Sequence, residues 1–117
     1  MATLVACLSV GKGTWQPVHD LIATKAFEKV VLVASQFAKE NYPNKLGAEL
    51  IVLDPSRPID ENIAFLAAEF KKIPDMEVGL NLISGTGVEH MAVLAALLKC
   101  GLGVRLVSVN AGSVHEL

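Results

Sequence analysis

The sequence predicts an α/β protein with an open parallel sheet of Rossmann type, and three observations favour this fold class. The chain has 117 residues, of which 52% are hydrophobic and 19% charged. It therefore has enough apolar surface for a core, and its length fits one domain, residues 1–117. Five apolar runs, rich in β-branched residues, lack the polar alternation of a half-exposed sheet. Helical patterns separate these runs, which is typical of parallel strands joined by helices on both faces.

The five predicted strands are the apolar runs, which we expect to be buried on both faces. They span residues 3–10, 29–34, 48–53, 78–83 and 104–109. Right-handed crossovers favour the strand order 3-2-1-4-5, and the flavodoxin-like order 2-1-3-4-5 is the alternative. Asp54 follows the third strand, so it lies at the sheet edge in the first order and at the ligand site in the second.

The predicted helices occupy the segments between the strands. Pro17 suits the first turn of the first helix. The segment 36–46 is a weaker helix because Pro43 interrupts it. Asp60 is a suitable N-cap for the next helix, which Pro74 brings to an end.

The last helix is apolar on two faces, and Gly101 suits its left-handed C-terminal position. Its apolar residues are Met91, Leu94, Ala95 and Leu98 on one stripe, with Val93 and Leu97 on a second face. A helix that is apolar nearly all round is buried on more than one side. This helix therefore predicts a contact with a second copy of the chain.

Composition and charge exclude several classes of protein. The formal net charge is −2, which argues against duplex nucleic acid as a partner. Two cysteines and no basic leader favour a cytoplasmic protein. No apolar run reaches the eighteen or so residues of a membrane span. No group of His, Cys, Asp and Glu has the spacing of metal ligands, so we predict no metal.

Two glycine-rich loops, each between a strand and a helix, are the candidate ligand site. Together they contribute Gly11, Lys12, Gly13, Thr14 and Trp15 from the first loop and Ser84, Gly85, Thr86, Gly87, Glu89 and His90 from the second. Glycines allow sharp turns, and helix N-termini present free amides to anions. In the first strand order both loops meet at one crevice, so they predict a phosphate or nucleotide site. The alternative is that the glycines only form the turns.

The loops do not match the dinucleotide fingerprint. Gln16 stands where its third glycine belongs, and Ala34 and Ser35 stand where an acidic residue should end the second strand. We therefore predict no nicotinamide or flavin cofactor, and we count Ser35 among the candidate ligand-binding residues.

Two short patterns in the sequence carry a resemblance to a known family. The first comprises Ser9-Val10-Gly11, Thr14-Trp15, Pro17-Val18 and the run 30–35 (VVLVAS). The second is the run 80–86 (LNLISGT) followed by Met91-Ala92. Together these patterns resemble the CARF family, the Rossmann-fold domains associated with CRISPR systems. That family usually has Thr-Gly where Ile83 and Ser84 stand, and lysine in place of Gly87. The resemblance covers essentially the whole chain in element order.

This resemblance implies a homodimer that binds cyclic oligoadenylate, the second messenger of type III CRISPR defence, across its twofold axis. The alternative is a metal-independent ring nuclease that cleaves cyclic tetra-adenylate, with His90 and Lys12 as candidate catalytic residues. Most such domains carry an effector, so we expect either an absent C-terminal effector domain or a free-standing protein that sequesters or degrades the messenger.

Several interpretations remain open at this point. Trp15 either stacks on a base or packs beneath the first helix. His90 is either an acid-base catalyst or an ordinary histidine of the helix surface or an interface. A third interpretation of the whole chain is a Rossmann-like assembly domain without a ligand.

Overall fold

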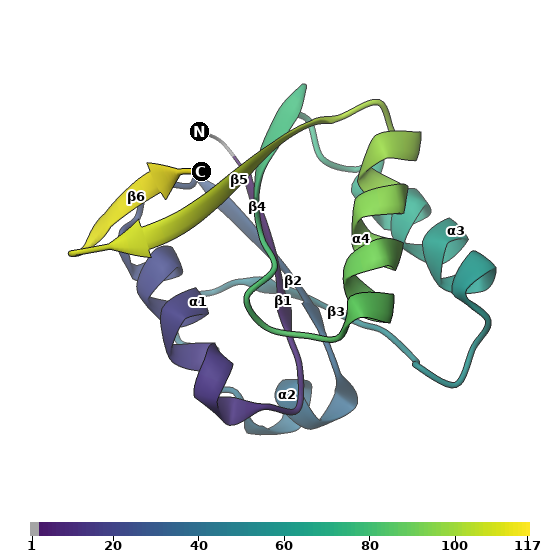
Figure 1. The fold of residues 1–117 in the computed structure, drawn as a ribbon, viewed down its shortest axis with the longest axis horizontal. Helices are drawn as coiled ribbons and strands as arrows, with labels where there is room; N and C mark the ends of the chain where they lie inside the picture. Colours follow the sequence, from purple (N-terminus) through teal and green to yellow (C-terminus); the bar gives the residue numbers. More distant parts are fainter. Residues whose placement is uncertain (1–2) are drawn as a thin grey trace.

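The computed structural model describes residues 3–117 as an α/β fold around one mixed sheet (Figure 1). The strands are β1 (Thr3–Leu8), β2 (Lys29–Ala34), β3 (Glu49–Val52), β4 (Glu77–Asn81), β5 (Gly103–Asn110) and β6 (Ser113–Glu116). The helices are α1 (Trp15–Ala23), α2 (Gln36–Asn41), α3 (Ile59–Phe70) and α4 (Gly87–Lys99), with a 3₁₀ turn η1 (Lys12–Thr14) before α1.

The strand order is β3-β2-β1-β4-β5-β6, and the first five strands pair in parallel. This confirms the predicted fold class and the order 3-2-1-4-5. The flavodoxin-like alternative is wrong, because β1 lies between β2 and β4. Asp54 accordingly follows the edge strand β3 and lies away from the switch point between β1 and β4.

The sixth strand is a feature that the sequence pattern did not predict. β6 pairs antiparallel with β5, and His115 lies in this strand opposite Ser108. The hairpin turns at Ala111 (φ 51°) and Gly112 (φ 78°). Two consecutive positive φ angles are what a two-residue hairpin of this hand requires. The turn was missed because Asn-Ala-Gly is a weaker signal than Asn-Gly.

The core lies on both faces of the sheet, because successive side chains of each strand point to opposite faces. Helices α1 and α2 cover the first face, and α3 and α4 cover the second (Figure 1). In β1, Leu4, Ala6 and Leu8 belong to the first cluster, whereas Val5 and Cys7 belong to the second.

The expectation that all five strands are buried on both faces is wrong for β5. Its central residue Val107 is buried against the side covered by α1, but Leu106 is 46% exposed. Leu106 pairs in register with Leu80, which belongs to the cluster under α3 and α4. Within residues 3–117, β5 is followed by β6 and not by a helix that packs on this part of that face, so Leu106 remains exposed there.

Helix ends agree only partly with the sequence signals. α2 ends at Asn41, before Pro43, and Gly101 has a φ of 72°, as expected for a left-handed helix end. Asp60 is not the N-cap of α3. The cap is Pro58, and Asp60 lies in the first turn. There its negative charge interacts favourably with the positive end of the helix dipole.

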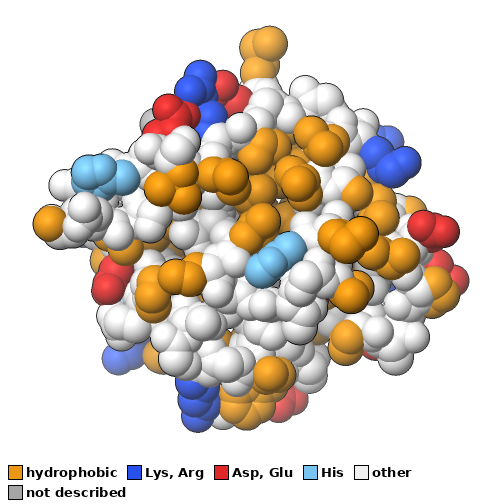
Figure 2. Space-filling view, viewed as in Figure 1, with side chains coloured by type: hydrophobic (Ala, Val, Ile, Leu, Met, Phe, Trp, Pro, Cys, Tyr) orange, Lys and Arg blue, Asp and Glu red, His pale blue; other side chains and the backbone are white. Residues whose placement is uncertain are grey.

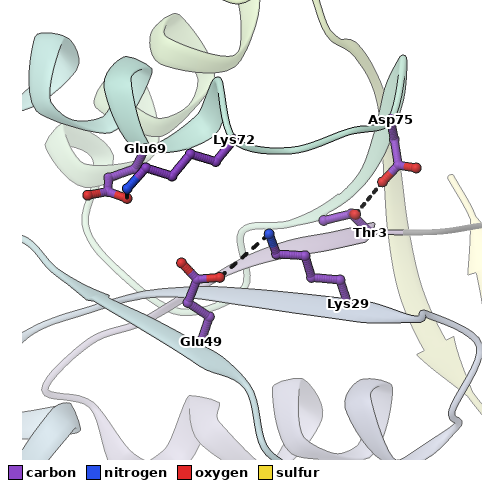
Figure 3. Close-up of polar contacts among 6 residues, drawn as sticks. All are labelled: Thr3, Lys29, Glu49, Glu69, Lys72 and Asp75. Carbon is purple, nitrogen blue, oxygen red and sulfur yellow. Dashed lines mark hydrogen bonds and ion pairs between the residues drawn. The ribbon is translucent and has the colours of Figure 1, made fainter.

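Polar contacts gather at the end of the sheet where β1, β2 and β3 begin (Figure 3). The Thr3 hydroxyl donates a hydrogen bond to Asp75, and Lys29 Nζ lies 3.6 Å from Glu49 Oε2. Exposed ion pairs of this kind contribute little to stability. These contacts lie at the amino ends of the strands. In an open parallel sheet the ligand site is expected at the opposite end, where the strands have their carboxyl ends.

Gly79 in β4 has no room for a side chain, so its replacement by alanine is expected to destabilise the protein. A Cβ there would lie 2.9 Å from Phe27 Cε1, a ring that is 8% exposed. Overpacking a core costs about 1–3 kcal/mol. Urea unfolding measures the loss, and Gly13→Ala is the control because its Cβ would meet nothing within 4 Å. Equal stability of the two variants would contradict the prediction.

Candidate functional site

The two glycine-rich loops meet at the carboxyl ends of β1 and β4, as the strand order predicts. Thr14 Oγ1 lies 2.7 Å from Ser84 Oγ, so the first loop contacts the second directly. The amide of Ser9, at the end of β1, donates to the same Ser84 oxygen at 3.0 Å. Ser84 is therefore the residue through which the two loops are held together.

The hydroxyls of these loops are occupied within the protein. Thr14 Oγ1 also lies 2.7 Å from the carbonyl oxygen of Gly11. Each hydroxyl carries one proton, so both contacts are satisfied when Ser84 donates to Thr14 and Thr14 donates to Gly11. Ser84 is fully buried. In this conformation it positions the loops and presents no donor to a ligand.

Thr86 and Glu89 form a capping box at the start of α4. The Glu89 amide donates to Thr86 Oγ1 at 3.2 Å, and the Thr86 amide donates to Glu89 Oε1 at 2.9 Å. Ser9 Oγ donates to the same carboxylate oxygen at 3.3 Å. These bonds and the helix dipole stabilise the negative charge of Glu89 where it stands.

Backbone amides are the donors that remain for an anion. In the described part of the chain, the amides of Gly85, Gly87 and Val88 donate to no protein group. Gly87 and Val88 begin α4, where the first amides have no partner within the helix. Gly11 and Gly13 are exposed on the facing loop. Such an arrangement suits phosphate oxygens.

Gly85 and His90 are packed against each other. Gly85 has a φ of 113°, a backbone angle that residues with a side chain rarely adopt. A Cβ at this position would lie 3.0 Å from His90 Nε2. His90 Nε2 lies 2.8 Å from the carbonyl oxygen of Ser84. A carbonyl only accepts, so Nε2 carries the proton and Nδ1 is the basic nitrogen of the neutral ring.

Trp15 packs inside the protein. It is 8% exposed, and its Nε1 donates to the carbonyl oxygen of Ser9 at 2.8 Å. Its ring lies edge-on to Tyr42 at 6.0 Å and tilted to Phe37 at 5.9 Å. This burial favours the packing interpretation of Trp15 over a stacking role.

Phe37 is an exposed aromatic residue beside the candidate site, and the sequence analysis did not identify it. It lies in α2 and is 38% exposed, and Lys12 Nζ lies 5.5 Å from its ring centroid. Ser35, the nearby candidate, caps α2 by accepting from the Ala38 amide at 3.0 Å. The position of Phe37 shortly after the second predicted strand was its signal in the sequence.

The Cys7 thiol lies close to the second loop and is buried. Burial, together with the nearby Glu89 charge, raises the pKa of the Cys7 thiol to about 12, so this residue stays protonated at neutral pH. Residues 3–117 hold no group of three or more His, Cys, Asp or Glu side chains that could bind a metal ion. Within the same residues, no helix has the length and apolar character needed to cross a bilayer.

Comparisons with known proteins found no matching family model and no matching curated protein.

Replacing Ser84 with alanine is expected to lower stability and to loosen the contact between the loops. The buried Ser9 amide would lose its acceptor, which costs about 1–3 kcal/mol. Thermal unfolding measures this loss, with Ser113→Ala as a control at an exposed serine. If the two variants melt together, Ser84 does not hold the loops as described.

Proposed function

We propose that this chain is a CARF-type domain that binds cyclic oligoadenylate between two copies of itself. The observation that carries this proposal is the joining of two glycine-rich loops by Ser84 at the switch point, with unpaired amides beside them. Ligands of open α/β sheets bind at this place. The two sequence patterns that resemble the CARF family include parts of both loops and extend into the neighbouring strands and helices.

The charge of the site fits a phosphate ring. The amides of Gly85, Gly87 and Val88 and the dipole of α4 supply positive potential without a full charge. Lys12 adds one cation, and within residues 3–117 no carboxylate forms an ion pair with it. Lys12 thereby substitutes for the lysine that the family usually has at the position of Gly87.

An exposed apolar face supports the second copy. Figure 2 shows hydrophobic side chains gathered over α4 and β5. We call this set the α4–β5 face; its large exposed members are Ile83, Val88, Met91, Leu94, Leu98 and Leu106. Contiguous apolar surfaces of this kind mark interaction sites. The helix predicted to be apolar on two sides is the one that forms it.

The α4–β5 face is continuous with the candidate site. Ile83 lies in the second loop, and Val88 lies in the first turn of α4. A twofold contact through this face would therefore bring the second loops of two copies close together. A cyclic ligand with twofold or higher symmetry matches such a pair of loops.

Ring cleavage is a second candidate function, and the geometry of His90 favours it. The Ser84 carbonyl fixes the proton on Nε2, which leaves Nδ1 as a base near the loops. In this step a ribose 2′-oxygen would give its proton to Nδ1 and bond to the adjacent phosphorus in line with the P–O5′ bond, which breaks. The amides would stabilise the charge that develops on the phosphorus oxygens. The released 5′-oxygen would take a proton from water or from the protonated His90, and the ring would open to a linear product with a 2′,3′-cyclic phosphate end.

Calorimetric titration with cyclic tetra- and hexa-adenylate tests the proposal, followed by chromatography of the recovered ligand. Intact ligand that elutes with the protein supports a sensor domain. Linear products support a ring nuclease, and their loss in His90→Ala would assign the base. No heat and no co-elution with either ring would contradict both functions and leave an assembly domain.

A further inference from the structure

An aromatic surface stands beside the two glycine-rich loops. Phe37 lies in α2, whose start is fixed by the Ser35 cap. Trp15 supports the Phe37 ring at 5.9 Å, and Tyr42 in turn holds Trp15 edge-on. Trp15 itself is anchored by its hydrogen bond to Ser9. The Phe37 ring is thus held by buried neighbours while more than a third of the residue faces solvent.

The group that now occupies this surface is replaceable. Lys12 Nζ lies over the Phe37 ring at 5.5 Å. A cation over an exposed ring gains only about 0.5–1 kcal/mol. An aromatic base stacks on the same surface with equal or greater stabilisation. Lys12 belongs to the exposed first loop. Its ammonium group could therefore move from the Phe37 ring to a phosphate of a ligand bound at the two loops.

We propose that Phe37 is the stacking surface for an adenine base of the ligand, and that Lys12 leaves this ring for a phosphate when the base arrives. This inference rests on the proposed function, because it places one nucleotide of the same ligand. It assigns base recognition to α2 and phosphate binding to the two loops. Trp15, the aromatic residue that the sequence suggested for stacking, serves as the support.

The test compares Phe37→Leu with Phe65→Leu. Phe65 lies in α3 and is 40% exposed, so the control removes an equally exposed ring away from the loops. Titration with cyclic tetra-adenylate should show at least about a fivefold loss of affinity for Phe37→Leu. Phe65→Leu should bind as the unmodified protein does, and Phe37→Tyr should retain affinity because it keeps a ring.

Salt dependence separates the two roles. Phe37→Leu should lower affinity by the same factor at low and high salt, because stacking carries no net charge. Lys12→Met should flatten the dependence of affinity on salt, because one phosphate contact is lost. Thermal unfolding of each variant shows whether it is folded.

The outcomes are distinguishable. If the unmodified protein binds no cyclic oligoadenylate, the proposed function fails and this assignment fails with it. If it binds, and Phe37→Leu matches Phe65→Leu, only the stacking role is wrong. A loss in Phe37→Tyr as large as in Phe37→Leu would also overturn it, since that result would point to packing with Trp15.

Discussion

Placing a glutamate at Leu98 is expected to convert the proposed dimer into a monomer and to abolish the proposed binding of the cyclic ligand. Leu98 is 61% exposed on the α4–β5 face, so the substitution leaves the core of each copy intact. A twofold contact would bury two such carboxylates without partners, and removing each of them from water costs several kcal/mol. The dimer should weaken at least about a hundredfold. Sedimentation equilibrium measures the change in mass.

Leu46→Glu is the matched control. Leu46 is 43% exposed and lies between α2 and β3, outside the α4–β5 face. It should leave both the dimer and ligand binding unchanged. An unmodified chain that sediments as a monomer with and without cyclic oligoadenylate would contradict the dimer. Ligand binding that survives in monomeric Leu98→Glu would show that one copy forms the whole site.

Most of the fold could be predicted because its signals are local and strong. β2 was predicted with the bounds that the structure shows. The predicted first strand differs from β1 only in extending two residues too far at its C-terminal end. Uninterrupted apolar runs require cover on both faces, and right-handed crossovers then leave few strand orders. β5 exposes the limit of this reasoning. A run as apolar as 104–109 looks the same whether a helix or another surface covers it.

The hairpin of β5 and β6 could not be predicted from hydrophobic pattern. β6 is short and largely exposed, so burial imposes no alternation on its sequence. Its pairing depends on the turn at Ala111 and Gly112. Ala111 adopts a positive φ there, and alanine in a sequence does not indicate such an angle.

The location of the candidate site was predictable, but the roles of its side chains were not. Glycine and helix N-termini identify loops that approach a ligand, and the strand order places both loops together. Whether a hydroxyl faces outward depends on tertiary contacts. The Ser84 and Thr14 hydroxyls share a hydrogen bond across the loops, and the capping box engages Thr86. Phe37 was missed because exposure of an aromatic ring depends on how α2 packs.

Replacing Gly85 with alanine is the second substitution with a large expected effect, because two independent constraints meet there. A side chain at a φ of 113° is strained, at about 1–3 kcal/mol. The new methyl group would also lie 3.0 Å from His90 Nε2 and 3.5 Å from Cys7 Cβ. The loop must shift, and with it the amides offered to the ligand. We expect lower thermal stability and at least about a tenfold loss of affinity for cyclic tetra-adenylate.

Two comparisons separate these causes. Gly87→Ala adds the same methyl group two residues later, where a Cβ meets nothing within 4 Å, and it should keep the stability of the unmodified protein. His90→Ala combined with Gly85→Ala removes the steric contact but retains the backbone strain. The double variant should therefore be more stable than the sum of the single effects indicates. Strict additivity would show that backbone strain alone requires glycine here and that the ring of His90 does not constrain the loop.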